Sequence, residues 1–277
     1  MSDRVCVVTG ATGGIGYETA RGIAQHGATV VIVGRSLERC RTAVDQIRRQ
    51  TGNPSVEYLV ADLSILADIR RLAGEVEKRY PRLHVLVNNV GALFLNGQVS
   101  ADGIEMTLAL NHLGCYLLTR LLCPVLQASA PARIVNVSSF VHTGARIDLP
   151  TIEFSGWKGY KRSKLANLLF TYELARRLEG TGVTANALSP GFVASNFGMN
   201  NSGPFPKIKP LMNWFAVSNE TGARTSVYLA SSADVEGVSG KYYSRCTLRR
   251  SSRVSTDRAA AARLWEMSAG MTGLTAD

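Results

Sequence analysis

The chain has 277 residues, of which 45% are hydrophobic and 19% charged, a composition that excludes a disordered or fibrous protein and is typical of a soluble globular one. Its longest apolar run, residues 113–126, is interrupted by Arg120 and Pro124, and its first residues lack the pattern of a secretory signal, so we predict a cytoplasmic protein with no membrane span. The net charge of +10 comes from dispersed basic residues without a nucleic-acid-binding motif, which predicts a solvated basic face and no nucleic-acid partner.

Short β-branched runs alternate with longer amphipathic segments along the chain, which is the pattern of βαβ units. The predicted strands, in chain order, are residues 4–9, 29–34, 56–61, 84–88, 133–138, 183–188 and 240–243. Runs such as Val30–Val33 are apolar throughout, as expected for strands that helices cover on both faces. We therefore predict an α/β fold of the Rossmann type, with a doubly wound, mostly parallel seven-stranded sheet and helices on both faces, forming a single domain over residues 1–277.

A glycine-rich turn follows the first predicted strand and opens a predicted helix at residues 17–26. It reads Thr9-Gly10-Ala11-Thr12-Gly13-Gly14-Ile15-Gly16. Glycines let the backbone approach a pyrophosphate closely, and the start of a helix offers free N–H groups to it. The position between strand and helix favours a dinucleotide-binding site over an ordinary turn, with contacts from Gly10, Thr12, Gly13, Gly14, Ile15 and Gly16.

The end of the second predicted strand indicates which dinucleotide is bound. Sites for NAD usually carry a carboxylate there, but no Asp or Glu occurs between Thr19 and Leu37. The strand runs instead into Arg35, with Arg39 about one helical turn later. Because guanidinium groups pair with a 2′-phosphate, we predict a preference for NADP(H) over NAD(H). The alternative is that Arg35 is merely a solvated residue.

Two further motifs carry acid/base chemistry. Tyr160 and Lys164 are four residues apart and share one helix face, so the ammonium lies near the phenol and favours its ionised form. The fifth predicted strand ends in Ser138-Ser139, at the edge of the sheet where open α/β folds bind their ligands. A hydroxyl there can hold a carbonyl oxygen.

Together with Asn88-Asn89-Val90-Gly91 and Pro190-Gly191, these motifs make the chain resemble the short-chain dehydrogenase/reductase family throughout its length. It is most similar to the retinol-dehydrogenase-like branch, at residues 110–114, 133–139, 163–167, 239–243 and 263–265. The resemblance implies that Tyr160 donates the proton in reduction, that Lys164 lowers the pKa of Tyr160 and holds the nicotinamide ribose, and that Ser139 orients the substrate oxygen. It also implies that Asn111 positions a proton-relay water.

The resemblance extends to the rest of the cofactor site. It implies that Asp62 and Leu63 meet the adenine, that Asn89 and Gly91 line the nucleotide, and that the segment from Pro190 through Gly191 and Val193 to Ser195 closes around the nicotinamide. Two residues depart from the pattern of the branch. Val90 replaces the usual alanine, for which we expect little effect on the chemistry, and Tyr17 replaces a frequent lysine or arginine, which leaves the 2′-phosphate to Arg35 and Arg39.

We therefore expect an NADP(H)-dependent oxidoreductase that interconverts a ketone or aldehyde and an alcohol, acting as a reductase on an apolar or amphiphilic small molecule. The alternative is a catalytically silent nucleotide-binding regulatory or scaffold protein. Residues 195–218, rich in proline and aromatic residues, are predicted to cover the substrate, with dimer or core packing as the alternative.

The spacing of cysteines and histidines predicts neither a disulfide framework nor a metal site, and we expect His112 and His142 to pack and form hydrogen bonds rather than to act as an acid or base. The resemblance favours a homodimer or homotetramer. It does not lead us to expect the membrane anchor of many animal members, nor their retinoid activity.

Overall fold

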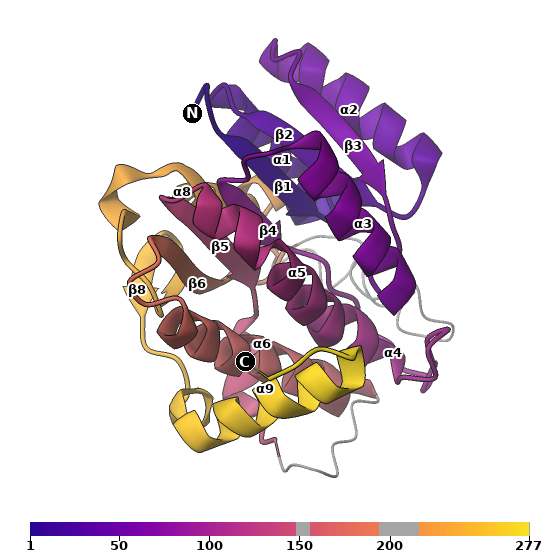
Figure 1. Ribbon diagram of the computed structural model, residues 1–277, viewed down its shortest axis with the longest axis vertical. Coiled ribbons are helices and arrows are strands. Elements are labelled where there is room, and N and C mark those ends of the chain that lie inside the picture. The colour runs from indigo at the N-terminus through magenta and orange to yellow at the C-terminus, as the bar shows by residue number, and fades with distance from the viewer. Residues whose placement is uncertain (148–155, 194–215, 277) are drawn as a thin grey trace.

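The computed structural model describes residues 1–147, 156–193 and 216–276 (Figure 1). One sheet has the strand order β3-β2-β1-β4-β5-β6-β7-β8, and its neighbours are parallel except for the antiparallel pair β7 and β8. The strands are β1 (Val5–Thr9), β2 (Thr29–Gly34), β3 (Val56–Val60), β4 (Val85–Asn88), β5 (Ala132–Val137), β6 (Val183–Ser189), β7 (Tyr242–Ser244) and β8 (Thr247–Arg249). The doubly wound, mostly parallel fold predicted from the sequence is confirmed.

The sheet has one strand more than the seven predicted. The extra strand, β8, has only three residues, all exposed, so it lacks the apolar alternation that identifies a strand in a sequence. Its connection to β7 is a two-residue turn in which Arg245 and Cys246 both adopt positive φ, at 54° and 57°. Such turns usually contain Asn or Gly, and neither residue is present here to mark the hairpin.

Helices cover both faces of the sheet, as Figure 1 shows. The helices α3 (Leu66–Arg79), α5 (Gly114–Ala128) and α6 (Gly156–Arg177) pack on one face, with α9 (Arg258–Thr272) lying against α6. The other face is covered by α1 (Gly14–Gln25), α2 (Leu37–Thr51) and α8 (Asn219–Ser231). A short helix, α4 (Met106–Leu108), leads into α5 through a π-helical turn, Ala109–Leu113.

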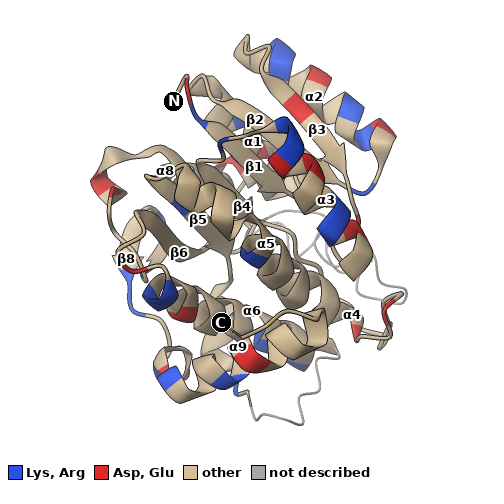
Figure 2. Cartoon of the chain, viewed as in Figure 1, with Lys and Arg blue, Asp and Glu red and all other residues tan. Residues whose placement is uncertain are grey.

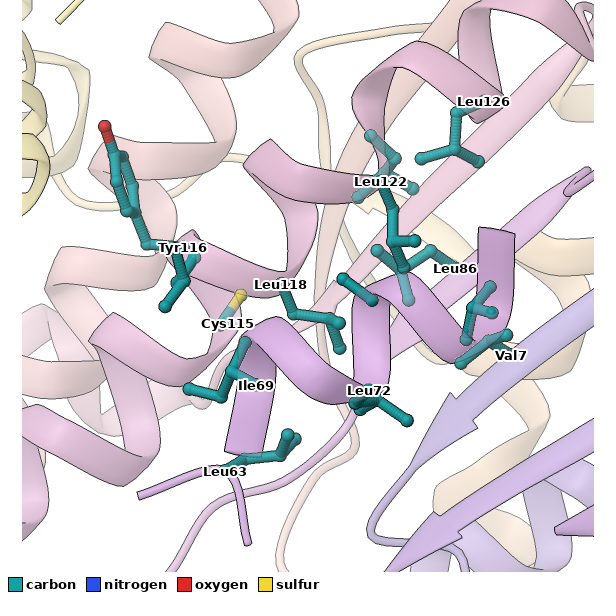
Figure 3. Packing of buried hydrophobic residues seen from close by; sticks show 14 of the residues in the cluster. Val7, Leu63, Ile69, Leu72, Leu86, Cys115, Tyr116, Leu118, Leu122 and Leu126 are labelled. Atoms are coloured by element: carbon teal, nitrogen blue, oxygen red, sulfur yellow. The ribbon is translucent and has the colours of Figure 1, made fainter. Parts of the chain in front are cut away.

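Alternate residues of the central strands enter the two cores, which explains why these strands are apolar throughout. Figure 3 shows one core, where Ile69 and Leu72 of α3 meet Leu118 of α5 above Val7 and Leu86 of the sheet. All five side chains are fully buried. Burial of this kind stabilises the fold by about 1.5–3 kcal/mol for each large aliphatic side chain.

The stretch Met106–Ala128 is long and apolar enough to cross a membrane by length and composition, although 72% of its most apolar window is buried inside the protein. The core helix of a soluble protein has the same properties, so this stretch is weak evidence for a membrane span. Figure 2 shows that charged residues are distributed over several helices rather than gathered on one of them.

Candidate active site

A cavity of about 880 Å³ lies where the parallel strands end, at the carboxyl edge of the sheet. Among the predicted site residues, those that line it are Gly10, Thr12, Gly13, Gly14, Ile15, Gly16, Arg35, Arg39, Asp62, Leu63, Asn89, Gly91, Ser139, Tyr160, Lys164, Pro190, Gly191 and Val193. Asn111 is fully buried and does not line the cavity. Ser195 and most of the predicted covering segment, residues 195–218, lie outside the described residues. The fold therefore brings nearly all of the predicted site to one place.

The glycine loop at one end of this cavity is folded too tightly to accept a side chain at several of its glycines. Gly10 and Gly14 adopt positive φ values of 65° and 59°, which favour glycine. A Cβ atom on Gly16 would collide with the side-chain amide of Asn89 and with the carbonyl of Gly10. The loop thus presents bare backbone and the start of α1 to the cavity, the arrangement that a pyrophosphate requires. This end of the cavity fits a dinucleotide.

Hydrogen bonds between the ends of β1 and β4 hold the loop in place. The Asn89 side-chain amide donates to the carbonyl oxygen of Thr9 at 2.9 Å. The Thr9 hydroxyl accepts from the backbone N–H of Asn89 at 2.9 Å and donates to the carbonyl of Val87 at 3.2 Å. Asn89 therefore shapes the nucleotide end as well as lining it. The sequence analysis did not identify the part played by Thr9.

Two arginines flank the glycine loop at the end of β2. Arg39 Nη2 lies 3.5 Å from the position that a Cβ atom of Gly13 would occupy, so its guanidinium reaches over the loop. Arg35 Nη1 lies 3.7 Å from Asp62 Oδ2, and the Arg35 side chain is 70% exposed. An ion pair this exposed contributes little, and it leaves the guanidinium accessible to an anion. The pairing of Arg35 with Asp62 was not anticipated from the sequence.

The catalytic candidates Tyr160 and Lys164 lie on consecutive turns of α6 at the other end of the cavity. This helix begins at Gly156, where φ is 61°, and so includes the whole motif. Lys164 Nζ lies 5.6 Å from the centre of the Tyr160 ring and donates to the carbonyl of Val137 at 3.2 Å. A Cβ atom on Gly91 would lie 2.8 Å from this Nζ, so a glycine at that position keeps space free beside the ammonium.

Burial governs the protonation of this pair in the free protein. It raises the pKa of Tyr160 well above its usual range, and a hydrogen bond with Ser139 opposes that rise. Burial also lowers the pKa of Lys164 to about 8. The causes that act on Tyr160 in the free protein are burial and the hydrogen bond with Ser139, so the expected lowering of its pKa by Lys164 stays a prediction. Desolvation therefore shifts both groups toward their neutral forms: Tyr160 stays protonated, and Lys164 keeps its charge only below about pH 8.

Asn111 lies behind the cavity, in the π-helical turn that precedes α5. Its side chain forms two hydrogen bonds with the backbone of Ala92, from Ala92 N–H to Oδ1 at 2.8 Å and from Nδ2 to the carbonyl at 2.9 Å. Its Nδ2 also donates to the hydroxyl of Ser163 at 3.1 Å, and that hydroxyl donates to the carbonyl of Tyr160 at 2.8 Å. Asn111 thereby connects the loop after β4 to α6, the helix that carries Tyr160 and Lys164. Its participation in a proton relay stays a prediction.

The two histidines beside the site form hydrogen bonds inside the protein, which confirms the structural role expected for them. His142 Nδ1 lies 2.6 Å from the Ser139 carbonyl, and its Nε2 accepts from the backbone N–H of Ser252 at 3.1 Å. His112 lies between Asn167 and Ser268 on α6 and α9. Burial lowers the pKa of both rings, that of His112 to about 4, so both are neutral at physiological pH.

Four lining residues with a bearing on function were missed by the sequence analysis. The Ser138 hydroxyl donates to the carbonyl of Lys164 at 2.7 Å and ties α6 to the end of β5. Phe140, Trp157 and Phe192 line the same end of the cavity and are 50%, 48% and 42% exposed. Each of the three lies close in the sequence to a predicted site residue, Ser139, Tyr160 or Gly191, and that closeness could have identified them as lining residues.

A second cavity, of about 1260 Å³, contains none of the predicted site residues. It lies at the amino ends of the central strands, and its lining includes Arg4, His84, Arg133, Lys241 and Arg249. Three basic residues that are close in the sequence, Lys241, Arg249 and Arg250, therefore border this cavity. Over residues 1–147, 156–193 and 216–276, no group of three or more His, Cys, Asp or Glu side chains is arranged to hold a metal ion.

Comparison with known proteins gives relatives along the whole chain. Residues 4–203 match the family model described as short chain dehydrogenase. Human retinol dehydrogenase 11 is 40% identical over 281 residues, which cover 100% of this chain and 88% of that protein. Human retinol dehydrogenase 14 is 41% identical over 295 residues, covering 99% and 88%.

Solved structures are also similar to this chain. The crystal structure of an uncharacterised protein from Mycobacterium paratuberculosis has a TM-score of 0.80 and 32% identity, covering 100% of this chain and 96% of that one. Pseudomonas aeruginosa RhlG, in a complex with NADP at its active site, has a TM-score of 0.71 and 26% identity, covering 87% and 94%. The fold is thus shared with these solved structures along most or all of the chain.

Proposed function

Because this chain belongs to the short-chain dehydrogenase/reductase family, and is thus an oxidoreductase of carbonyl and alcohol groups, we propose that it is an NADP(H)-dependent reductase of apolar or amphiphilic ketones or aldehydes. The observation that carries the proposal is the meeting of Ser139, Tyr160 and Lys164 in one cavity with the glycine loop. The reverse reaction, alcohol oxidation, uses the same groups.

The chemistry of the site follows from these side chains. The glycine loop would hold a nicotinamide dinucleotide, which would supply the hydride for the carbonyl carbon. A carbonyl oxygen placed between the Ser139 hydroxyl and the Tyr160 phenol accepts a hydrogen bond from each of them. As charge develops on that oxygen, Tyr160 transfers its proton to it, which avoids a free alkoxide. Lys164, when protonated, stabilises the tyrosinate that remains.

The preference for NADP(H) is supported by the charges at the end of β2. Arg39 reaches over the glycine loop, and Arg35 is accessible next to it. The described residues that line this end of the cavity contribute one carboxylate, Asp62, which lies within ion-pair distance of Arg35. Two guanidinium groups offset that charge and can pair with a 2′-phosphate.

We also propose that the protein is cytoplasmic and that it forms a homodimer or homotetramer. Light scattering of the purified protein measures the mass of the assembly, and fractionation of cells that express it tests the location. A monomer at working concentration would remove the oligomer from the proposal without affecting the chemistry.

The first experiment titrates the purified protein with NADPH and NADH by nicotinamide fluorescence, then measures turnover of a carbonyl panel by wild type and Tyr160→Phe. The panel includes retinal, since the relatives carry the name retinol dehydrogenase. We expect tighter binding of NADPH and a loss of turnover of at least about 100-fold in the variant, with nucleotide affinity largely retained.

Three other results would contradict parts of this proposal. Equal efficiency with both cofactors, or a preference for NADH, removes the NADP(H) assignment. Normal turnover by Tyr160→Phe removes the role of the phenol. Binding without turnover of any carbonyl favours the alternative, a catalytically silent nucleotide-binding protein, and no binding of either nucleotide overturns the proposal at its base.

A further inference from the structure

We propose that Trp157 is a specificity-determining residue whose indole receives a planar ring of the substrate, so that the site prefers a carbonyl compound carrying a flat ring over a saturated one of the same size. The inference rests on the proposed function and adds to it the substrate class and the residue that selects it. Trp157 lies three residues before Tyr160, in the first turn of α6.

The indole of Trp157 is stacked directly on the catalytic phenol. The two ring centroids are 5.7 Å apart, and the ring planes differ by 25°. Tyr160 is only 8% exposed, whereas Trp157 remains 48% exposed although it lines the cavity. The indole thus covers part of the Tyr160 ring and keeps a large apolar surface of its own open beside it.

Exposed aromatic side chains are concentrated at this end of the cavity. The large hydrophobic side chains that are exposed among the described residues are Leu37, Val99, Phe140, Trp157, Phe192, Val217, Leu248 and Val254. The three aromatic ones, Phe140, Trp157 and Phe192, all line the active-site cavity. Apolar surface that remains accessible in a concave site is typical of a ligand-binding surface.

The charges of the lining separate the two ends of the cavity. Arg35, Arg39 and Asp62 lie at the nucleotide end. At the other end, the described lining residues contribute one ionisable cation, Lys164, which is buried beside Tyr160. The surface around Trp157 therefore suits an uncharged apolar group. An aromatic face distinguishes a flat ring from a puckered one, because stacking requires close approach over the whole ring.

The test uses two ketones that differ only in the flatness of a ring: benzylacetone and its cyclohexyl analogue. Two methylene groups separate ring and carbonyl in both, so their intrinsic reactivities match. We expect wild type to favour benzylacetone by about 5-fold in kcat/KM, the size expected of one aromatic stack. Trp157→Leu should bring the ratio close to one, and Trp157→Phe should retain most of it. Leu248→Ala, which removes an exposed side chain on β8, is the matched control and should keep the wild-type ratio.

A binding measurement separates this inference from the proposed function. Each ketone is titrated into the protein in the presence of NADP⁺, where no reduction can occur, and tryptophan fluorescence is recorded for wild type and Trp157→Phe. We expect about 5-fold tighter binding of benzylacetone by wild type, and a fluorescence change that the variant largely loses. If the affinity ratio persists while neither ketone is reduced in the presence of NADPH, the proposed function fails and the inference stands.

The opposite results overturn the inference. An unchanged ratio in Trp157→Leu, with both ketones slowed equally, would mean that the indole only supports Tyr160. Equal affinity of wild type for both ketones would show that the indole does not select a flat ring, whatever the turnover.

Discussion

The two ends of the active-site cavity differ in their lining: one consists largely of backbone and the other of side chains. The nucleotide end consists largely of backbone: a loop in which a side chain on Gly16 would collide with Asn89 and Gly10, and the first N–H groups of α1. The end that holds Tyr160 consists of side chains, with Trp157 and other exposed aromatic residues. Backbone geometry restricts the sequence strongly, whereas an aromatic lining can change without disturbing the fold. We therefore expect the first end to set the cofactor class and the second to determine which substrate is accepted.

The largest effect that would sharpen this comparison is expected at Ser139. Replacing it with alanine removes one of the two donors to the carbonyl oxygen, so we expect kcat/KM to fall by about 100-fold while NADPH affinity stays unchanged. Steady-state kinetics and a nucleotide titration measure the two quantities. Ser55→Ala, at an exposed position outside the cavity, serves as control. A parallel loss of NADPH affinity would mean that the two ends are not independent.

A change at Gly16 should instead weaken the binding of the nucleotide. Gly16→Ala forces the Asn89 amide and the Gly10 carbonyl to move, at a cost of about 2 kcal/mol, so we expect about 30-fold weaker binding of NADPH and NADH alike. Gly74→Ala is a matched control, since Gly74 is exposed in α3 with nothing within 4 Å of the added methyl group. Full nucleotide affinity in Gly16→Ala would show that the loop is less constrained than its geometry indicates.

Replacing Arg39 tests whether the nucleotide end of the cavity binds a 2′-phosphate. Loss of one charge-assisted hydrogen bond in Arg39→Ala should weaken NADPH binding by about 10-fold and leave NADH binding unchanged. Arg41 lies on the same helix and contacts Tyr58 instead of the cavity, so Arg41→Ala is the control. An equal loss for both nucleotides would assign Arg39 to the shape of the loop rather than to the phosphate.

The smallest expected effect is a dependence of NADPH affinity on pH, which arises from the protonation of Lys164. The Lys164 pKa is lowered to about 8 in the free protein, so the side chain loses its proton above that pH. An anionic nucleotide favours the charged form and raises the pKa, so the complex binds more protons than the free protein. We therefore expect NADPH affinity to fall by about 4-fold between about pH 7 and about pH 8.5.

Lys164→Met provides the comparison for this titration. Its nucleotide affinity should be nearly independent of pH over that range, because the group that takes up the proton is gone. Affinity that stays constant in wild type as well would show that Lys164 keeps the same protonation state with and without nucleotide.

Backbone-dependent features were predictable from the sequence. Glycine spacing between a strand and a helix identified the loop, and apolar runs identified the central strands. The β7–β8 hairpin was missed because Arg245 and Cys246 adopt positive φ without the usual turn residues. The raised pKa of Tyr160 was also missed, because burial depends on which segments pack around a side chain, and spacing along the chain does not contain that information.

The strand order has a consequence for how the protein acquires its function. Thr9 and Val87, whose hydrogen bond lies behind the glycine loop, are 78 residues apart in the chain. The cavity also needs β5 and β6 on the far side of β4, so it forms only after several distant segments have docked, each at an entropic cost. Refolding is therefore expected on a slow time scale of milliseconds or longer, with nucleotide affinity emerging last. A nucleotide should then lengthen the lifetime of the folded state more than it accelerates its formation.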